Sequence, residues 1–197
     1  MSEPLTRCRP MFLTSATNLI VDGLLALVYP QACAICHGCV SRRQLGIACE
    51  DCWQASRFLT EADTICWKCG APSLATIEPD KRTTVRCGRC ADDAYTVARA
   101  CGDYAGALQA VVLALKREAN VSQYLLKLLA EAQQRPPLDQ STVVMPVPLH
   151  PDREKERGFN QAAIIGRQLA RRVKLPFVEC SLIRTSHSER HRAGMDA

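Results

Sequence analysis

The sequence predicts an α/β protein in two parts, a cysteine-rich N-terminal region and a C-terminal parallel sheet with flanking helices. Eight cysteines between Cys33 and Cys90 form four Cys-x2-Cys pairs, a spacing typical of metal sites. From Tyr95 onward, short apolar runs alternate with amphipathic stretches, which is the pattern of βαβ units in a parallel sheet. The composition shifts near Asp92. We therefore expect a helix over residues 12–30, a metal-binding domain over 31–92 and an α/β domain over 93–197.

The overall composition is that of an ordinary globular chain. Of 197 residues, 47% are hydrophobic and 23% are charged, which suits one or two domains. Aromatic residues make up only 5%, so an extensive base-stacking surface is not expected. The net charge of +5 arises between Asp152 and Arg192. This basic end fits phosphate ligands or nucleic acid, and the alternative is a solvated helix face.

The segment from Phe12 to Tyr29 has apolar residues on one helical face, and it is too short and too polar to span a membrane. A secretion signal is the alternative, because basic residues precede an apolar stretch and Ala32-Cys33-Ala34 imitates a cleavage site. However, Asp22 interrupts the apolar stretch, and cleavage there would remove Cys33 from its pair. We expect a cytoplasmic protein without a membrane span, whose N-terminal helix docks on the next domain or on a partner.

The cysteine pairs predict two zinc ions. Zinc prefers four thiolates in a tetrahedron, at zinc–sulfur distances of about 2.3 Å, and each Cys-x2-Cys turn supplies two of them. Disulfides are the alternative, but a reducing cytosol disfavours them. If neighbouring pairs share a metal, two sequential sites result, whereas alternate pairs give a cross-braced module. The predicted ligands are Cys33, Cys36, Cys49, Cys52, Cys66, Cys69, Cys87 and Cys90.

The two zinc sites are expected to be structural, because each has four protein ligands and no open position for catalysis. The cysteine region has few large apolar side chains, so zinc should supply much of its folding free energy. Each tetrathiolate site carries a charge of −2 with its metal, which reduces the positive charge of the whole chain. The loops carry six cations that either meet phosphates or stay solvated, namely Arg42, Arg43, Lys81, Arg82, Arg86 and Arg89.

Strands and helices alternate in the C-terminal part. We expect a strand over 95–101, a helix that closes near Lys116, and a second helix from the N-cap Ser122 to about Gln134. A strand over 143–145, a helix over 161–173 and a strand over 177–180 follow. In the helix over 161–173, the residues expected on the buried side are Ala162, Ile165, Leu169 and Val173.

The segment from Val143 to Gln161 is the centre of this part. Its apolar start predicts a buried strand, and three prolines over residues 146–151 disfavour both ladder pairing and helix, so a stiff extended loop should follow. Three cations over residues 153–157 then precede a helix capped by Asn160. Cations beside a helix N-terminus, at the carboxyl end of a strand, favour a phosphate. The alternative is a strand, loop and helix with a solvated charged loop.

The stretch P-V-P-L-H-P-x-R-x-x-x-R-G-F-N-Q, from Pro146 to Gln161, closely resembles the signature of the ComF/GntX family of competence-associated proteins. The resemblance implies a double zinc ribbon joined to a type I phosphoribosyltransferase-like domain. It also implies binding of phosphoribosyl diphosphate with Mg²⁺, because arginine suits forked phosphate contacts. The diphosphate-binding residues that it implies are Pro146, Val147, Pro148, Arg153, Arg157, Gly158, Asn160, Gln161 and Lys116.

One later motif of that family, D-D-x-x-T-T-G-x-T, does not occur in this sequence. In the family it holds the ribose and the 5′-phosphate; here Asp92-Asp93 is the only Asp-Asp pair, and no glycine loop follows it. The chain therefore resembles a C-terminally truncated member with an incomplete sheet, which would expose an unpaired edge. We assign no catalytic residue and do not expect an active transferase from this chain alone.

Three functions follow from these patterns. The first is a ComF-type protein that handles single-stranded DNA during uptake, together with other proteins of the competence machinery. The second is a Mg²⁺-dependent phosphoribosyltransferase. The third is a zinc-stabilised interaction module without catalytic activity.

Overall fold

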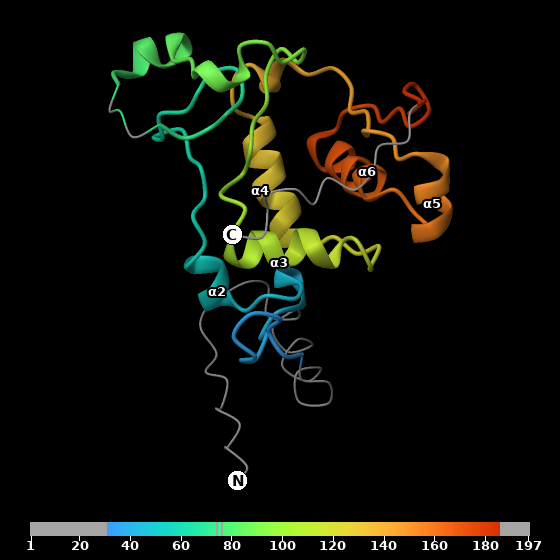
Figure 1. The fold of residues 1–197 in the computed structure, drawn as a ribbon. Helices are drawn as coiled ribbons and strands as arrows, with labels where there is room; N and C mark the ends of the chain where they lie inside the picture. Colours follow the sequence, from blue (N-terminus) through green and yellow to red (C-terminus); the bar gives the residue numbers. More distant parts are fainter. Residues whose placement is uncertain (1–30, 74, 76, 186–197) are drawn as a thin grey trace.

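The structure is a computed structural model, and it describes residues 31–73, 75 and 77–185. The helix predicted over residues 12–30 lies outside these ranges. Figure 1 shows α4 in the middle, with α3 across one end of it and α6 beside it, while α2 lies beyond α3. No helix in the described ranges is long and apolar enough to cross a lipid bilayer. The elements in chain order are η1 (Arg43–Leu45), α2 (Glu50–Gln54), η2 (Pro79–Thr84), η3 (Gly88–Cys90), α3 (Gly106–Ala114), α4 (Gln123–Gln133), η4 (Leu138–Gln140), α5 (Pro151–Arg157) and α6 (Gln161–Val173).

The predicted parallel sheet of a type I phosphoribosyltransferase-like domain is wrong for the described residues, which contain helices and isolated bridges but no β-strand. Two of the predicted strands meet only at one parallel bridge, between Val144 and Phe177. There, the Val144 N–H donates to the Pro176 carbonyl at 2.9 Å, and the Val178 N–H donates to the Val144 carbonyl at 3.0 Å. Pro146 and Pro148 have no N–H, so this pairing cannot continue along the chain.

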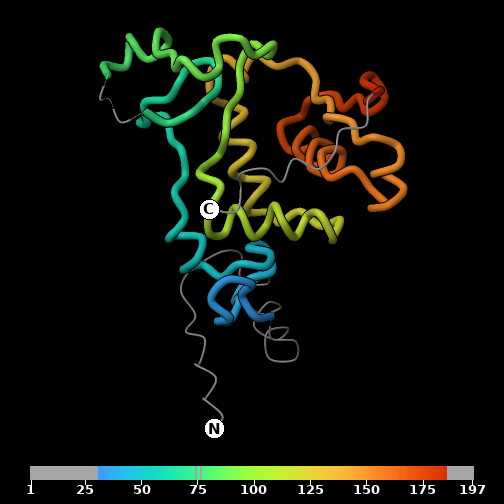
Figure 2. Tube along the Cα trace, viewed as in Figure 1, coloured from blue at the N-terminus to red at the C-terminus, as the bar shows by residue number. Residues whose placement is uncertain are grey.

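The strand predicted over residues 95–101 is also wrong, because its backbone groups bond to the cysteine region instead of to a sheet. The Ala98 N–H donates to the Lys68 carbonyl at 2.7 Å, and the Cys101 carbonyl accepts from the Leu59 N–H at 3.0 Å. In Figure 2 this segment runs between the two ends of the molecule, as does the segment that follows α2. One antiparallel bridge, between Phe58 and Gly102, joins the two segments.

The helices α3 and α4 lie where the sequence predicts them. The Ser122 hydroxyl accepts from the Leu125 N–H at 3.2 Å, so Ser122 caps α4 as expected. The N-terminus of α3 is capped from outside, because the Ala107 N–H donates to the Ser56 hydroxyl at 3.2 Å. The apolar residues of α3 and α4 form the main core together with the first cysteine region, and that core crosses the predicted domain boundary at residue 92.

The segment predicted as a stiff loop after Pro148 is instead the helix α5. Proline is tolerated at the first position of a helix, because the N–H at that position has no partner within the helix. Pro151 takes this position, and the His150 ring accepts from the Asp152 N–H at 3.3 Å. Gly158 ends α5 in the left-handed conformation, at φ 82°.

Helix α6 begins at the predicted cap, since the Asn160 side chain accepts from the Ala162 N–H at 2.9 Å. Its buried residues are Ala163, Gly166 and Ala170, whereas the predicted apolar face, residues 162, 165, 169 and 173, is half-buried. The small buried residues Ala163, Gly166 and Ala170 let α6 pack closely on its neighbours. A Cβ added at Gly166 would lie 3.1 Å from the Phe177 ring.

Candidate metal centres and the predicted phosphate site

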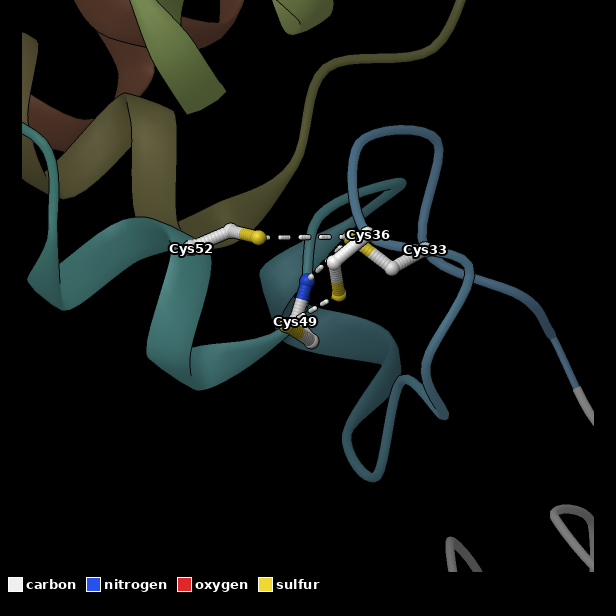
Figure 3. Close-up of side chains that lie close together, drawn as sticks. All are labelled: Cys33, Cys36, Cys49 and Cys52. Atoms are coloured by element: carbon white, nitrogen blue, oxygen red, sulfur yellow. Dashed lines mark hydrogen bonds between the residues drawn. The ribbon is translucent and has the colours of Figure 1, made fainter. Parts of the chain in front are cut away.

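The first cysteine unit, residues 31–54, brings four thiols together. The Sγ atoms of Cys33 and Cys52 lie 3.8 Å apart, and those of Cys36 and Cys49 lie 3.5 Å apart. Figure 3 shows the four side chains converging, two from the loop before η1 and two from the start of α2. The Cys49 N–H also points at the Cys33 sulfur, at 3.3 Å.

The second cysteine unit, residues 64–91, repeats this geometry. The Sγ atoms of Cys66 and Cys90 lie 3.6 Å apart, and those of Cys69 and Cys87 lie 3.5 Å apart. The Cys87 N–H points at the Cys66 sulfur at 3.3 Å, as the Cys49 N–H does at Cys33. Each site is therefore built from neighbouring Cys-x2-Cys pairs, and within each site all four ligand atoms lie within 4.8 Å of one another.

The turns that present the first two ligands of each unit are the same structure. The Cys33 N–H donates to the Gly38 carbonyl at 2.7 Å, and the Cys66 N–H donates to the Ala71 carbonyl at 2.8 Å. Antiparallel bridges flank both turns at matching positions, 32 with 39 and 65 with 72. The left-handed residue is Gly70 in the second turn and His37 at the equivalent position of the first.

The geometry fits zinc and excludes disulfides within each site. A tetrahedron with zinc–sulfur distances of about 2.3 Å places its sulfur atoms about 3.8 Å apart, close to the separations of 3.5–3.8 Å found here. A disulfide requires about 2.05 Å. Because each site combines two neighbouring Cys-x2-Cys pairs, the two zinc sites follow one another along the chain. The cross-braced alternative is excluded.

The thiols of each unit have divergent acidities before a metal is bound. Burial by itself raises the pKa of Cys33, but N–H groups of Cys36, Cys49 and Ile35 lower it to about 6. The corresponding Cys66 behaves alike: burial raises its pKa, and N–H groups of Cys69, Cys87 and Lys68 lower it to about 6. Each unit thus holds one thiolate readily.

Two other thiols in each unit resist ionisation, because burial raises the pKa values of Cys49, Cys52, Cys69 and Cys90. Burial raises the pKa of Cys90 to about 12, and hydrogen bonds and the charge of its neighbours Cys87 and Cys66 add to this. In the first unit, burial and the Cys33 charge likewise raise the pKa of Cys52. Four thiolates repel one another unless a cation lies between them, and a divalent metal supplies that charge.

The first unit is part of the main hydrophobic core. Trp53, in α2, is 1% exposed, and its indole N–H donates to the Leu45 carbonyl at 3.0 Å. The Trp53 ring lies 4.7 Å from the Tyr124 ring of α4 and 6.2 Å from the Phe58 ring. This aromatic cluster joins α2 to α4, so the first zinc site shares its core with the C-terminal helices.

The second unit is held mainly by cations that bind backbone carbonyls. Arg99 donates through Nη1 to the Trp67 carbonyl at 2.8 Å and through Nη2 to the Pro136 carbonyl at 2.9 Å. Its guanidinium also lies 4.8 Å from the centre of the Trp67 ring. Lys68 donates to the carbonyls of Ala91 and Asp93, at 2.9 and 2.7 Å.

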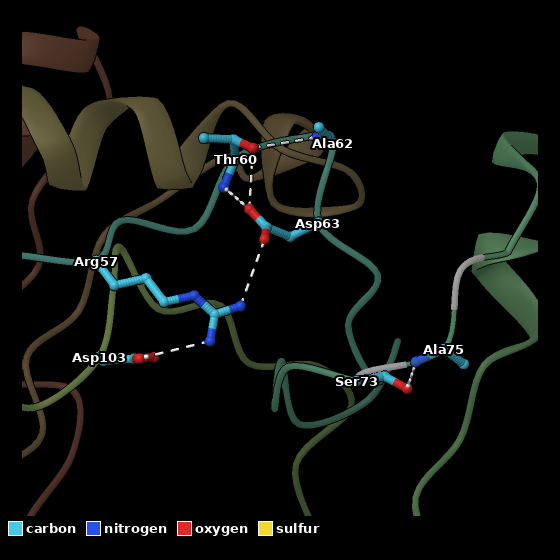
Figure 4. A network of polar contacts seen from close by, with 7 residues as sticks. All are labelled: Arg57, Thr60, Ala62, Asp63, Ser73, Ala75 and Asp103. Carbon is cyan, nitrogen blue, oxygen red and sulfur yellow. Dashed lines mark hydrogen bonds and ion pairs between the residues drawn. The ribbon is translucent and has the colours of Figure 1, made fainter.

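The linker between the two units, residues 55–63, holds a small polar network, drawn in Figure 4. Arg57 lies between Asp63 and Asp103, with nitrogen–oxygen distances of 3.6 Å to both. Asp63 also accepts from the Thr60 N–H at 2.7 Å and from the Thr60 hydroxyl at 2.9 Å. The donation from Thr60, with a smaller contribution from Arg57, lowers the pKa of the Asp63 carboxyl.

The residues predicted to bind diphosphate are only partly brought together. Arg157 donates to the Gln161 side-chain oxygen at 2.5 Å, and Asn160 donates to the Val147 carbonyl at 3.0 Å. Arg153 lies 3.9 Å from Glu156 within α5. Lys116 is exposed beyond the end of α3, and no hydrogen bond or ion pair among the described residues links its side chain to α5 or α6. Gly158 has open space around it, and Val147 is 70% exposed.

Sequence reasoning missed Arg99 and the aromatic cluster that holds the first unit. Arg99 lies in a segment whose apolar residues predict a strand, so the sequence gives no sign that its charge holds another part of the chain. The signal for Trp53 is its place in a helix that begins at a cysteine ligand, four positions before it. The corresponding position of the second unit is Ala91, which is exposed.

Residues 24–103 match the double zinc ribbon domain family. No curated protein and no solved structure gives a significant match to the chain. The family match and the two tetrathiolate sites agree, so the chain contains a double zinc ribbon domain whose two four-cysteine sites fit two structural zinc ions.

Proposed function

From the premise that this chain contains a double zinc ribbon domain, we propose that it binds single-stranded nucleic acid in DNA uptake or processing, as its resemblance to ComF-type proteins implies. The observation that carries the proposal is a group of three exposed cations at the end of α6, Arg171, Arg172 and Lys174. None of them has an ion pair among the described residues. Unpaired cations close together can each displace a counterion from a phosphate backbone.

The charges of the cysteine units make these units weaker candidates for phosphate binding than the end of α6. In the first unit, Arg42 is paired with Glu50 at 2.8 Å. In the second, Arg86 donates to the Thr83 carbonyl at 2.7 Å, and Arg82 donates to the Glu61 carbonyl; these bonds occupy donor groups but leave both charges in place. A zinc tetrathiolate adds a charge of −2 to each unit. Helix α5 contains three acidic and three basic residues, so its charges balance.

The test is binding of a fluorescent oligothymidine strand to the zinc-loaded chain, followed by anisotropy over a range of salt concentrations. Replacing all three cations of α6 with glutamine should flatten the dependence of log K on log salt by about two, since each phosphate contact on a single strand contributes about 0.7. The control is Lys81→Gln with Arg89→Gln, two exposed cations of the second unit. Absence of binding at low salt, or an equal effect of the control, contradicts the proposal.

A second candidate function is binding of phosphoribosyl diphosphate with Mg²⁺ between Pro146 and Gln161. One observation favours it: Arg157 is held by the neutral amide of Gln161 and not by a carboxylate, so its charge remains available. The open space beside Gly158 gives an anion access to the backbone. Mg²⁺ would neutralise the diphosphate, and Arg157 would bind its oxygens.

A thermal melt of the zinc-loaded chain tests this candidate. Phosphoribosyl diphosphate with Mg²⁺ should raise the melting temperature, and Arg157→Ala should remove the increase. Lys155→Ala, on the same helix, is the matched control and should keep it. An unchanged melting temperature of the parent chain at saturating ligand contradicts diphosphate binding at this segment.

A further inference from the structure

A cavity of about 330 Å³ lies between the first cysteine unit and the helix pair α4–α6. Its walls come from η1, α2 and α4, and Arg172 of α6 closes one side. The volume is near the lower end of the range for small-molecule sites, roughly 300–1,000 Å³, so it suits one small organic ligand. None of the residues predicted to bind diphosphate lines this cavity.

Tyr124 gives the cavity an accessible aromatic surface. Trp53 and Tyr124 both line the cavity, with ring centres 4.7 Å apart and planes tilted by 51°. Trp53 is only 1% exposed, so the aromatic surface that a ligand can reach is that of the half-buried Tyr124. Burial, followed by the charges of Glu131 and Glu50, raises the pKa of Tyr124, which keeps its phenol neutral. Such a surface suits a planar ring.

The rim of the cavity is positively charged. Three cations line it against one carboxylate, and that carboxylate, Glu50, is paired with Arg42. Lys127 lies 3.7 Å from Glu131 in an exposed pair, which binds weakly in water. The Arg172 side chain has no ion pair or hydrogen bond within the described ranges. Lys127 and Arg172 therefore leave positive charge available at the mouth of the cavity.

Three amide side chains complete the lining. Gln44, Gln54 and Gln123 come from η1, α2 and α4, and they face solvent at the cavity. The side chains of these three residues make no hydrogen bond to any part of the chain that the structure describes. An amide offers both a donor and an acceptor, so the three together can bind hydroxyl groups or the edge of a heterocycle.

We infer that this cavity binds a small anion that carries a planar ring, of the size of a mononucleotide. The ring lies on Tyr124, with Trp53 buried against that side chain, and the anionic group contacts Lys127 and Arg172. The amides bind the polar groups between them. The inference does not rest on strand binding, because its ligand is a free small molecule and most of its lining lies outside the cation group of α6.

The test is isothermal titration of the zinc-loaded full chain with adenosine and cytidine 5′-monophosphates. Separate titrations use adenosine, ribose 5-phosphate and inorganic phosphate. We expect one saturable site for a mononucleotide and affinities at least about tenfold weaker for each part alone, because ring and phosphate both contribute. If no mononucleotide binds to the folded chain, or if inorganic phosphate binds equally well, the inference is wrong.

Three exposed positions provide the variants. Lys127→Gln and Arg172→Gln should each weaken mononucleotide binding about tenfold, the effect of losing one charge-assisted contact. Arg171→Gln, beside Arg172 on α6 but outside the cavity lining, should leave it unchanged. An equal loss in Arg171→Gln would mean general charge attraction and overturn the inference. Lys127→Gln should not alter the salt dependence of strand binding, so the failure of one proposal is distinguishable from the failure of the other.

Discussion

The two cysteine units share one ligand geometry but are stabilised in different ways. In both, the turn, the flanking bridge and the N–H that points at the first thiol are the same. The first unit then buries Trp53 against Phe58 and Tyr124, whereas the second is held by Arg99 and Lys68 bonded to carbonyls. A zinc site therefore fixes a local turn, and the residues outside the ligand set decide whether that turn becomes part of a core.

The largest expected difference between the units is their response to loss of zinc. A structural zinc site supplies on the order of 10 kcal/mol of folding free energy, and a small protein has a net stability of roughly 5–15 kcal/mol. Cys33→Ser with Cys49→Ser should therefore abolish cooperative unfolding, since the core of α3 and α4 depends on this unit. Cys66→Ser with Cys87→Ser should leave that transition in place.

Urea unfolding followed by circular dichroism, together with hydrogen exchange, measures this difference. The second-site variant should lose exchange protection over residues 64–91 alone. Atomic emission should find one zinc ion per chain in both variants. This control shows that each pair of substitutions removes one zinc ion and leaves the other bound. If both pairs of substitutions abolish the transition, the two units are equally coupled to the core and the comparison fails.

Removal of one tryptophan from each unit should sharpen the comparison. Trp53→Ala leaves a cavity in the core and should cost about 3–5 kcal/mol. Trp67 is half-buried and contacts Arg99, so Trp67→Ala should cost only about 1 kcal/mol. Both values come from denaturant unfolding of the zinc-loaded chain. Equal losses would mean that the second unit contains as much core as the first.

A smaller effect is expected from the cations that hold each unit. Arg99→Gln removes charged donors from three carbonyls and should cost about 1–2 kcal/mol. It should also speed zinc release from the second site to a chromogenic chelator. Arg42→Gln breaks a partly exposed ion pair in the first unit and should cost less than about 1 kcal/mol. A faster release from the first site in Arg99→Gln would contradict the assigned role.

The smallest effect concerns the joint between the units and depends on pH. The folded-state pKa of Asp63 lies below its ordinary value, so its ionised form stabilises the fold above the unfolded-state pKa of about 4, and this stabilisation is lost as pH falls through the folded value. Asp63→Asn should cost under about 1 kcal/mol at neutral pH. The wild-type minus variant difference in urea unfolding should stay constant from pH 8 to pH 5. A difference that shrinks across that range would contradict the assignment.

The sequence was sufficient for the metal centres and for the starts of α4 and α6, because these depend on local chemistry. Cysteine spacing determines the ligand set, and the caps at Ser122 and Asn160 act within one helical turn. The pairing of cysteines followed from structure, because spacing alone allows two arrangements. Within α6 the buried face was displaced by one position, since the small residue Gly166 and not an apolar one packs on Phe177.

The sheet could not be predicted correctly, because strand pairing depends on partners far along the chain. An apolar run such as Val143 to Met145 has the pattern of a buried strand, yet only Val144 finds a partner. The segment at Ala98 and Cys101 has its hydrogen bonds taken by the second unit and its linker. For α5, the prolines suggested a loop, but Pro151 occupies the one helical position where proline is tolerated.

The aromatic cluster of Trp53, Phe58 and Tyr124 also bears on the order in which the chain folds during synthesis. The second unit has all four metal ligands within residues 64–91 and receives Arg99 soon afterwards, so it can bind its metal early in synthesis. The first unit leaves the ribosome earlier, but the ring of Trp53 has its partner in α4, far along the chain. Because distant contacts require a longer loop to close, the unit that is made first should complete its packing last.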